Sequence, residues 1–359
     1  SFRMIKPPLK SRLILFVASV AVVLPLLQAN ETPFSAGRAA LEAGAELPEI
    51  AVDGNRFVTP DGETVIFRGV SVPDPADLVR RERWNRAFFE EVRNWGANLV
   101  RLPVHPAEWR ETGTDEYLAM IDQAVEWCGD LGMYLIIDWH TIGNILTGVY
   151  HRDVYLTSKD ETFRFWNTIA QRYRGSSVVA FYELYNEPTN RNGQFGPLEW
   201  DEYSEFIEDL ISMIYAIDEN VIPLVTGFDW GYDLSPVRED PIDAPGVAYV
   251  THPYPQKRPE PWEDWWEREW GFVAETYPIV ATEFGFMSED GPGAHVPVIG
   301  DVEYGERILA FFAERGISWT AWVFDDDWSP QMFSEGDNYT PTEQGAFFKE
   351  KMRQLNTFP

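Results

Sequence analysis

Glu187 and Glu283 are the two residues of this 359-residue chain whose type and placement best suit acid–base chemistry. Cleavage of a glycosidic bond with retention uses one carboxylic acid to protonate the leaving oxygen and a carboxylate about 5 to 5.5 Å away to attack the anomeric carbon. We expect Arg101 and the hydroxyl of Tyr254 to keep Glu283 ionised. Glu187 must hold its proton until the leaving group takes it. The sequence therefore predicts Glu187 as the acid/base and Glu283 as the nucleophile.

Eight short apolar runs predict the strands that position these glutamates. Most are continuously hydrophobic, as expected of parallel strands that are buried on both faces. The runs cover residues 65–72, 98–104, 133–140, 179–187, 222–229, 247–254, 278–286 and 317–324. Amphipathic stretches between most of them predict crossover helices at 84–95, 116–130, 161–173, 201–217, 262–275 and 303–315. This alternation predicts an α/β fold, a (β/α)8 TIM barrel, whose chemistry lies at the carboxyl ends of its strands.

The rest of the chain adds little to this barrel. Residues 52–58 and the turn residues after them predict a short N-terminal β-hairpin. The fifth unit is the weakest, because residues 231–245 resemble a loop more than a helix. No linker rich in Gly, Ser or Pro follows residue 50, so we expect one catalytic domain over residues 51–359.

Polar and aromatic residues gather at the predicted strand ends. They are Arg101, His140, Asn186, Glu187, His252, Tyr254, Glu283 and Trp322. Any one of them alone could be a buried polar residue satisfied by a neighbour or a tryptophan that fills the core. Their convergence on one barrel mouth favours a site. Glu183, four residues before Glu187, is expected to lie deeper in the barrel, paired with Arg68 or Arg101.

Six segments around these residues resemble, in order and spacing, the signature set of family 5 of the glycoside hydrolases, the cellulase-like barrels. They are Asn-Leu-Val-Arg-Leu-Pro at 98–103, Asp-Trp-His at 138–140, Tyr-Asn-Glu-Pro at 185–188, His-Pro-Tyr at 252–254, Thr-Glu-Phe-Gly at 282–285, and Trp322. The Asn-Glu-Pro element alone is shared by several barrel families. The six together, over about residues 51–355, are specific.

The resemblance implies roles for the residues that surround the glutamates. Asn186 would hold the sugar 2-hydroxyl, and Trp322 would form the floor under the reacting sugar. The other residues around that sugar would be Arg101, His140, His252 and Tyr254. Val323 departs from the small residue that many relatives have after this tryptophan, which leaves the choice of substrate open.

Tryptophans are more numerous than core packing usually requires, with 15 in the chain. Indoles can stack on the apolar C–H faces of sugar rings. The candidates near or after strand ends are Trp139, Trp230, Trp262, Trp265, Trp266 and Trp328. Trp230 and Trp328 directly follow strands five and eight and are the best candidates for substrate binding. Trp265 and Trp266 lie on a predicted helix, where they equally suit packing.

Charge and metal-ligand residues limit the partners. A formal net charge of −29 disfavours nucleic acids and anionic membranes, because an acidic surface repels both. The five histidines show no paired ligand spacing, so we expect neither a metal nor another cofactor. Cys128 is the single cysteine, which excludes an intrachain disulfide.

These observations predict a retaining β-glycoside hydrolase that acts on a polysaccharide or oligosaccharide. The first substrate is β-1,4 or mixed-linkage β-1,3/1,4 glucan, and β-mannan is the second. A non-catalytic carbohydrate-binding barrel is the alternative from another class, but it would not need both glutamates with their Arg, His and Tyr partners.

Residues 1–29 resemble a secretory signal. Basic residues Arg3, Lys6, Lys10 and Arg12 precede an apolar run over 13–27, which predicts a secreted or periplasmic enzyme. An uncleaved segment would instead anchor the enzyme to a membrane. The mostly small and apolar arm over residues 30–50 suits either a spacer or a strip that packs on a neighbouring subunit, which would make a homo-oligomer.

Overall fold

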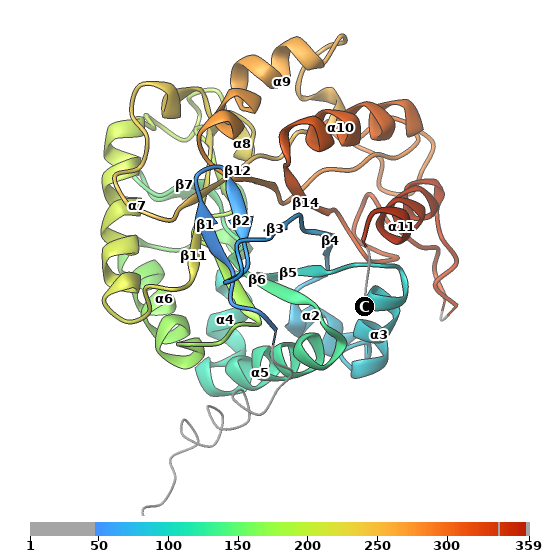
Figure 1. Ribbon diagram of the computed structural model, residues 1–359, viewed down its shortest axis with the longest axis horizontal. Coiled ribbons are helices and arrows are strands. Elements are labelled where there is room, and N and C mark those ends of the chain that lie inside the picture. Colours follow the sequence, from blue (N-terminus) through green and yellow to red (C-terminus); the bar gives the residue numbers. More distant parts are fainter. Residues whose placement is uncertain (1–46, 337, 357–359) are drawn as a thin grey trace, which may run out of the picture.

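A computed structural model describes residues 47–336 and 338–356 of the chain. In Figure 1 the parallel strands form a central barrel that is surrounded by helices. The signal-like segment 1–29 and the arm up to residue 46 lie outside the described residues. No helix in the described part is both long enough and apolar enough to cross a membrane.

Eight parallel strands close into one barrel. In chain order they are β4 (Arg68–Ser71), β5 (Leu99–Val104), β6 (Tyr134–Trp139), β9 (Val179–Glu183), β11 (Ile222–Thr226), β12 (Ala248–Val250), β13 (Ile279–Ala281) and β14 (Ser318–Ala321). Each strand pairs with the next along the chain, and β14 pairs with β4 to close the ring. Every strand lies inside one of the predicted runs, and all their residues are buried except Arg68. The prediction of a (β/α)8 barrel is confirmed.

Helices cover the outside of the barrel. They are α2 (Pro75–Arg80), α3 (Arg86–Asn94), α4 (Pro106–Thr112), α5 (Thr114–Leu131), α6 (Lys159–Tyr173), α7 (Trp200–Tyr215), α9 (Glu263–Glu269), α10 (Val302–Arg315) and α11 (Glu343–Leu355). The four-residue element α8 (Phe228–Gly231) contains two left-handed residues and lies at the cleft. Side chains of Asn85, Ser158, Asp301 and Thr342 cap α3, α6, α10 and α11, because each accepts a backbone N–H of the first turn. As expected, the fifth unit is mostly loop, with α8 and a short 3-10 turn over Ser235–Arg238.

The amino-terminal hairpin closes the bottom of the barrel. It contains β1 (Ala51–Asp53), β2 (Arg56–Val58) and β3 (Thr64–Val65), which form an antiparallel sheet. The ring of Phe57 packs edge-on against Phe67 and Phe181 inside the barrel. Ile50 joins the same cluster, and the Tyr134 hydroxyl donates to the carbonyl of Pro48 at 2.7 Å. The last residues of the expected arm therefore pack as part of the barrel floor.

A second small sheet, which the sequence pattern did not predict, lies at the opposite end. Strand β7 (Ile142–Asn144) pairs antiparallel with β8 (Val149–Tyr150) and parallel with β10 (Glu187–Pro188). In this register Glu187 lies opposite Ile142. The backbone of Glu187 is thus held by a hairpin that follows the third barrel strand.

Candidate active site

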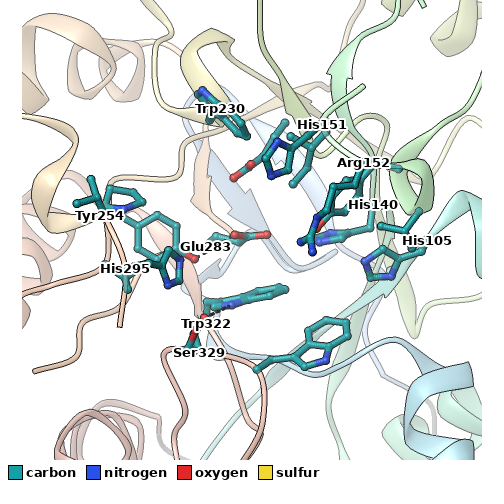
Figure 2. A pocket seen from close by; sticks show the side chains of 18 of the residues that line it. His105, His140, His151, Arg152, Trp230, Tyr254, Glu283, His295, Trp322 and Ser329 are labelled. Atoms are coloured by element: carbon teal, nitrogen blue, oxygen red, sulfur yellow. Dashed lines mark hydrogen bonds between the residues drawn. The ribbon is translucent and has the colours of Figure 1, made fainter. Parts of the chain in front are cut away.

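The carboxyl ends of the barrel strands surround a cleft of about 1050 Å³ (Figure 2). This is the size of an ordinary small-molecule or oligosaccharide site. Seven of the ten predicted site residues line it: His140, Glu187, Trp230, Tyr254, Glu283, Trp322 and Trp328. The other three, Arg101, Asn186 and His252, are fully buried. Arg101 and His252 contact the two glutamates from beneath, and Asn186 contacts Arg101.

Glu283 follows β13 and has both carboxylate oxygens occupied. Its Oε1 accepts from Nη1 of Arg101 at 2.9 Å, and its Oε2 accepts from the hydroxyl of Tyr254 at 3.0 Å. Burial raises the pKa of Glu283, whereas the cations of His252 and Arg101 oppose that rise. The arrangement holds an oriented carboxylate at the cleft, and both expected partners of Glu283 are in place.

Arg101 on β5 organises the carboxyl groups beneath the cleft. Its guanidinium donates to both oxygens of Glu183 at 2.8 and 2.9 Å and to Oδ1 of Asn186 at 2.6 Å, and it lies 3.0 Å from Asp138. Burial alone would lower the pKa of Arg101, but the charges of Asp138, Glu183 and Glu283 hold that pKa well above its ordinary value. The predicted pairing of Glu183 with Arg101 is confirmed. Contact of Asn186 with a sugar hydroxyl stays a prediction.

Glu187 is joined to the rest of the site through His252. Nδ1 of His252 lies 2.8 Å from Oε1 of Glu187, and its Nε2 lies 2.9 Å from the hydroxyl of Thr282, which in turn donates to Glu183. Burial lowers the pKa of His252, but Glu283, Glu183 and Glu187 together raise it to about 9. With these carboxylates ionised, the imidazole is cationic at neutral pH and both of its nitrogens donate.

The two candidate catalytic carboxyl groups face each other closely. One oxygen of Glu187, one of Glu283 and one nitrogen of His252 all lie within 4.8 Å of one another. Retaining glycosidases hold their carboxyl groups about 5 to 5.5 Å apart, whereas inverting enzymes need about 6.5 to 9.5 Å for an intervening water. The short separation is that of a retaining pair. A metal cation among these three groups would be repelled by the guanidinium of Arg101 beside Glu283. The cluster therefore suits proton transfer better than metal binding.

His140 and Trp322 form one wall of the cleft. Nδ1 of His140 lies 2.6 Å from Asp138, and the imidazole stacks on Trp322 with ring centroids 5.6 Å apart and planes 4° apart. Burial and the neighbouring cations lower the pKa of His140 well below its usual value, so this ring is neutral. Val323 is fully buried, and its side chain is not part of the cleft surface.

The structure separates the tryptophan candidates into two groups. Trp328 stacks near Trp322 at 5.8 Å, and Trp230 meets His151 edge-on at 5.1 Å, both at the cleft. The others belong to the packing of the fold. Trp139 is fully buried and stacks on Phe165, Trp262 and Trp266 stack on each other, and Arg268 lies over Trp265.

Several cleft residues were not singled out from the sequence as site residues. They are His105, His151, Arg152, Tyr155 and Lys257. His105 carried a usable signal, because it follows β5 directly and comes four residues after Arg101. The rest lie in irregular segments or in short 3-10 turns without strand-like or helix-like periodicity, so nothing in the local pattern marked them.

Comparison with known proteins identifies the family of this chain. The sequence profile of Cellulase (glycosyl hydrolase family 5) matches residues 58–327, which is more than half of the chain. The chain belongs to glycosyl hydrolase family 5. Its Glu187 and Glu283 lie at the carboxyl ends of the fourth and seventh strands of this family 5 barrel, as the resemblance implied.

Individual relatives agree with this assignment. Endoglucanase A of Butyrivibrio fibrisolvens is 26% identical over 259 residues, 68% of this chain and 54% of that protein. Endoglucanase E-5 of Thermobifida fusca is 28% identical over 253 residues, 68% of this chain and 49% of that protein. The chain thus spans about half the length of the curated relatives it matches. A solved β-glucanase from Saccharophagus degradans, in complex with cellotetraose, is 47% identical with a TM-score of 0.86, covering 88% of this chain and 96% of that one.

Proposed function

We propose that this family 5 protein hydrolyses β-1,4 or mixed-linkage β-1,3/1,4 glucan by double displacement with retention. The observation that carries the proposal is the pair of Glu187 and Glu283, whose nearest ligand atoms lie within 4.8 Å across the cleft. Support for a glucan substrate comes from the relatives named as endoglucanases and from the β-glucanase that binds cellotetraose.

The first step transfers the sugar to the protein. The carboxylate of Glu283 attacks the anomeric carbon, the bond from that carbon to the leaving oxygen breaks, and Glu187 gives its proton to that oxygen. Arg101 and Tyr254 hold the attacking carboxylate in one orientation throughout. Because these donors are already in place, the site loses little free energy to reorganisation at the moment of reaction.

The second step releases the product. Glu187, now ionised, takes a proton from a water molecule while the water oxygen attacks the anomeric carbon. The ester bond to Glu283 breaks, and both carboxyl groups return to their starting states. His252 lies within hydrogen-bond distance of Glu187 and 4.0 Å from Glu283. Its positive charge stabilises either glutamate while that glutamate is ionised.

Product analysis on a polysaccharide panel tests this function. Purified enzyme is incubated with carboxymethyl cellulose, mixed-linkage β-glucan and β-mannan, and NMR follows the first-formed reducing ends. We expect oligosaccharides from a β-glucan with the β anomer formed first. Release from mannan alone would replace the substrate by the second candidate, and the α anomer would contradict the retaining mechanism.

We also propose that the enzyme is exported, secreted or periplasmic. The charged and then apolar order of residues 1–29 supports this. Expression of the full sequence in a bacterial host followed by amino-terminal sequencing of the exported protein tests it. Retention of the apolar run over 13–27 in a membrane fraction would instead show an anchored enzyme.

A further inference from the structure

The turn that carries Trp230 has a backbone that L-residues rarely adopt. Asp229 (φ 55°, ψ 54°), Trp230 (φ 60°, ψ 46°) and Gly231 (φ 76°) are three successive residues in the left-handed region. Such conformations persist only where surrounding contacts hold them. A Cβ at Gly231 would lie 2.7 Å from Nδ1 of His252, the nitrogen that contacts Glu187. The turn therefore packs directly against the acid/base machinery.

The ammonium group of Lys257 holds this turn. It donates to the carbonyl oxygen of Asp229 at 2.8 Å and to that of Trp230 at 3.4 Å. Among the described residues no carboxylate forms an ion pair with Lys257, so its polar contacts there are these carbonyls. The side chain is partly shielded from solvent, and this burial lowers the pKa of Lys257. A partly buried ammonium that binds two successive carbonyl groups clamps the backbone of the strained turn.

Trp230 lines the cleft next to the residues that hold Glu187. Glu187 protonates the leaving oxygen, and the Trp230 turn touches the histidine that contacts Glu187. Figure 2 shows Trp230 beside His151 on the side of Glu283 opposite Trp322. Trp322 and Trp328 stack together on that other side. The two tryptophan platforms thus flank the glutamates, one for each part of a cleaved chain.

We propose that Lys257 is a positioning residue that fixes Trp230 as the platform for the sugar on the leaving-group side of the scissile bond. The proposal rests on the glucanase function proposed above. Without the ammonium, the carbonyl groups of Asp229 and Trp230 lose a charged donor, and the left-handed turn relaxes. The indole then loses its edge-on contact with His151. Sugar leaving groups lose binding, while an activated aryl leaving group departs with little help from such contacts, so its release is affected much less.

The experiment compares two substrates in one set of variants. Lys257→Met keeps the aliphatic stem and removes the charge. For this variant, the ratio of kcat/KM on mixed-linkage β-glucan to kcat/KM on 4-nitrophenyl β-cellobioside is expected to fall about tenfold, the effect of losing a charge-assisted contact. Lys257→Arg, which keeps a cation, should recover part of that ratio. Lys351→Met, a surface lysine paired with Glu306 outside the cleft, is the matched control and should keep the wild-type ratio.

A double-variant cycle separates positioning from direct substrate contact. Trp230→Ala should lower the same ratio, and adding Lys257→Met to it should lower the ratio no further, because both changes remove one platform. If the losses multiply, Lys257 contacts substrate itself and the proposal is overturned. Equal loss on both substrates, or an unchanged ratio, overturns it as well. Thermal unfolding of each variant shows that the fold is kept.

Failure of this inference is distinguishable from failure of the proposed function. A wild-type enzyme without activity on any β-glucan contradicts the function, and the ratio is then taken with the polysaccharide of the panel that the enzyme does cleave. An active wild type whose ratio is insensitive to Lys257→Met contradicts the role of Lys257 alone.

Discussion

Replacement of His252 by glutamine removes a buried cation while leaving a neutral group able to donate a hydrogen bond. The Nδ1 atom of His252 lies 4.0 Å from Oε2 of Glu283, and the imidazole pKa of about 9 keeps it charged at neutral pH. An opposite charge within about 4 to 6 Å shifts a carboxyl pKa by about 1 to 3 units. Loss of the cation should therefore raise the pKa of Glu283 by that amount, on top of the rise that burial already causes.

The acidic limb of the pH–activity curve reports this change. Glu283 must be ionised to attack, so the limb in kcat/KM should move to higher pH by roughly 1 to 3 units in His252→Gln. The assay uses 4-nitrophenyl β-cellobioside, whose leaving group needs little protonation. His295→Gln is the matched control, because His295 is an exposed cleft histidine that bonds a backbone carbonyl. An acidic limb that stays in place in His252→Gln would refute the electrostatic role of His252.

Stability gives a second measurement of the same charge. The pKa of His252 rises on folding from about 6.5 to about 9, so its protonation stabilises the fold fully below about pH 6.5, and that stabilisation is lost as pH rises through about 9. The difference of about 2.5 units corresponds to about 3 kcal/mol. Urea unfolding at pH 6.5 and 9.5 should show this loss in the wild type and not in His252→Gln. Equal losses in both proteins would contradict the assignment of a cationic His252.

Four further predictions follow from the site and the chain. Glu187→Gln and Glu283→Gln should each lower turnover by orders of magnitude with thermal unfolding unchanged, because each removes one half of the double displacement; near wild-type rates in either would reject the pair. In Glu187→Gln the alkaline limb should move or vanish, and an unchanged limb on aryl glycosides would refute its role as acid/base. Activity should survive EDTA, and its loss with recovery on adding a divalent cation would show a metal site at Glu187, His252 and Glu283. Deletion of residues up to Glu46, which keeps the residues of the barrel floor, tests the arm by light scattering: a smaller mass supports subunit bridging, and a monomer with and without the arm excludes it.

The barrel and the identity of its key residues were readable from the sequence. Parallel strands buried on both faces require continuous apolar runs, and each run carried its polar residues at one end. Because the carboxyl ends of all eight strands meet at one mouth, Glu187 and Glu283 could be placed together although they come from the fourth and seventh strands. The division of the tryptophans also followed from position, since Trp230 and Trp328 come directly after strands.

Tertiary structure decided how these residues are connected. Arg101 has three carboxylate partners. Whether a site residue lines the cleft or supports it from beneath depends on the direction of its side chain, which no local sequence pattern predicts. The small sheet of β7, β8 and β10 depends on a two-residue pairing between segments that lie more than 40 positions apart in the chain. Lys257 gains its role only because the chain folds the loop after β12 against the turn after β11. Hydrophobic periodicity determines which segments form the barrel, whereas long-range packing determines which polar groups meet at its mouth.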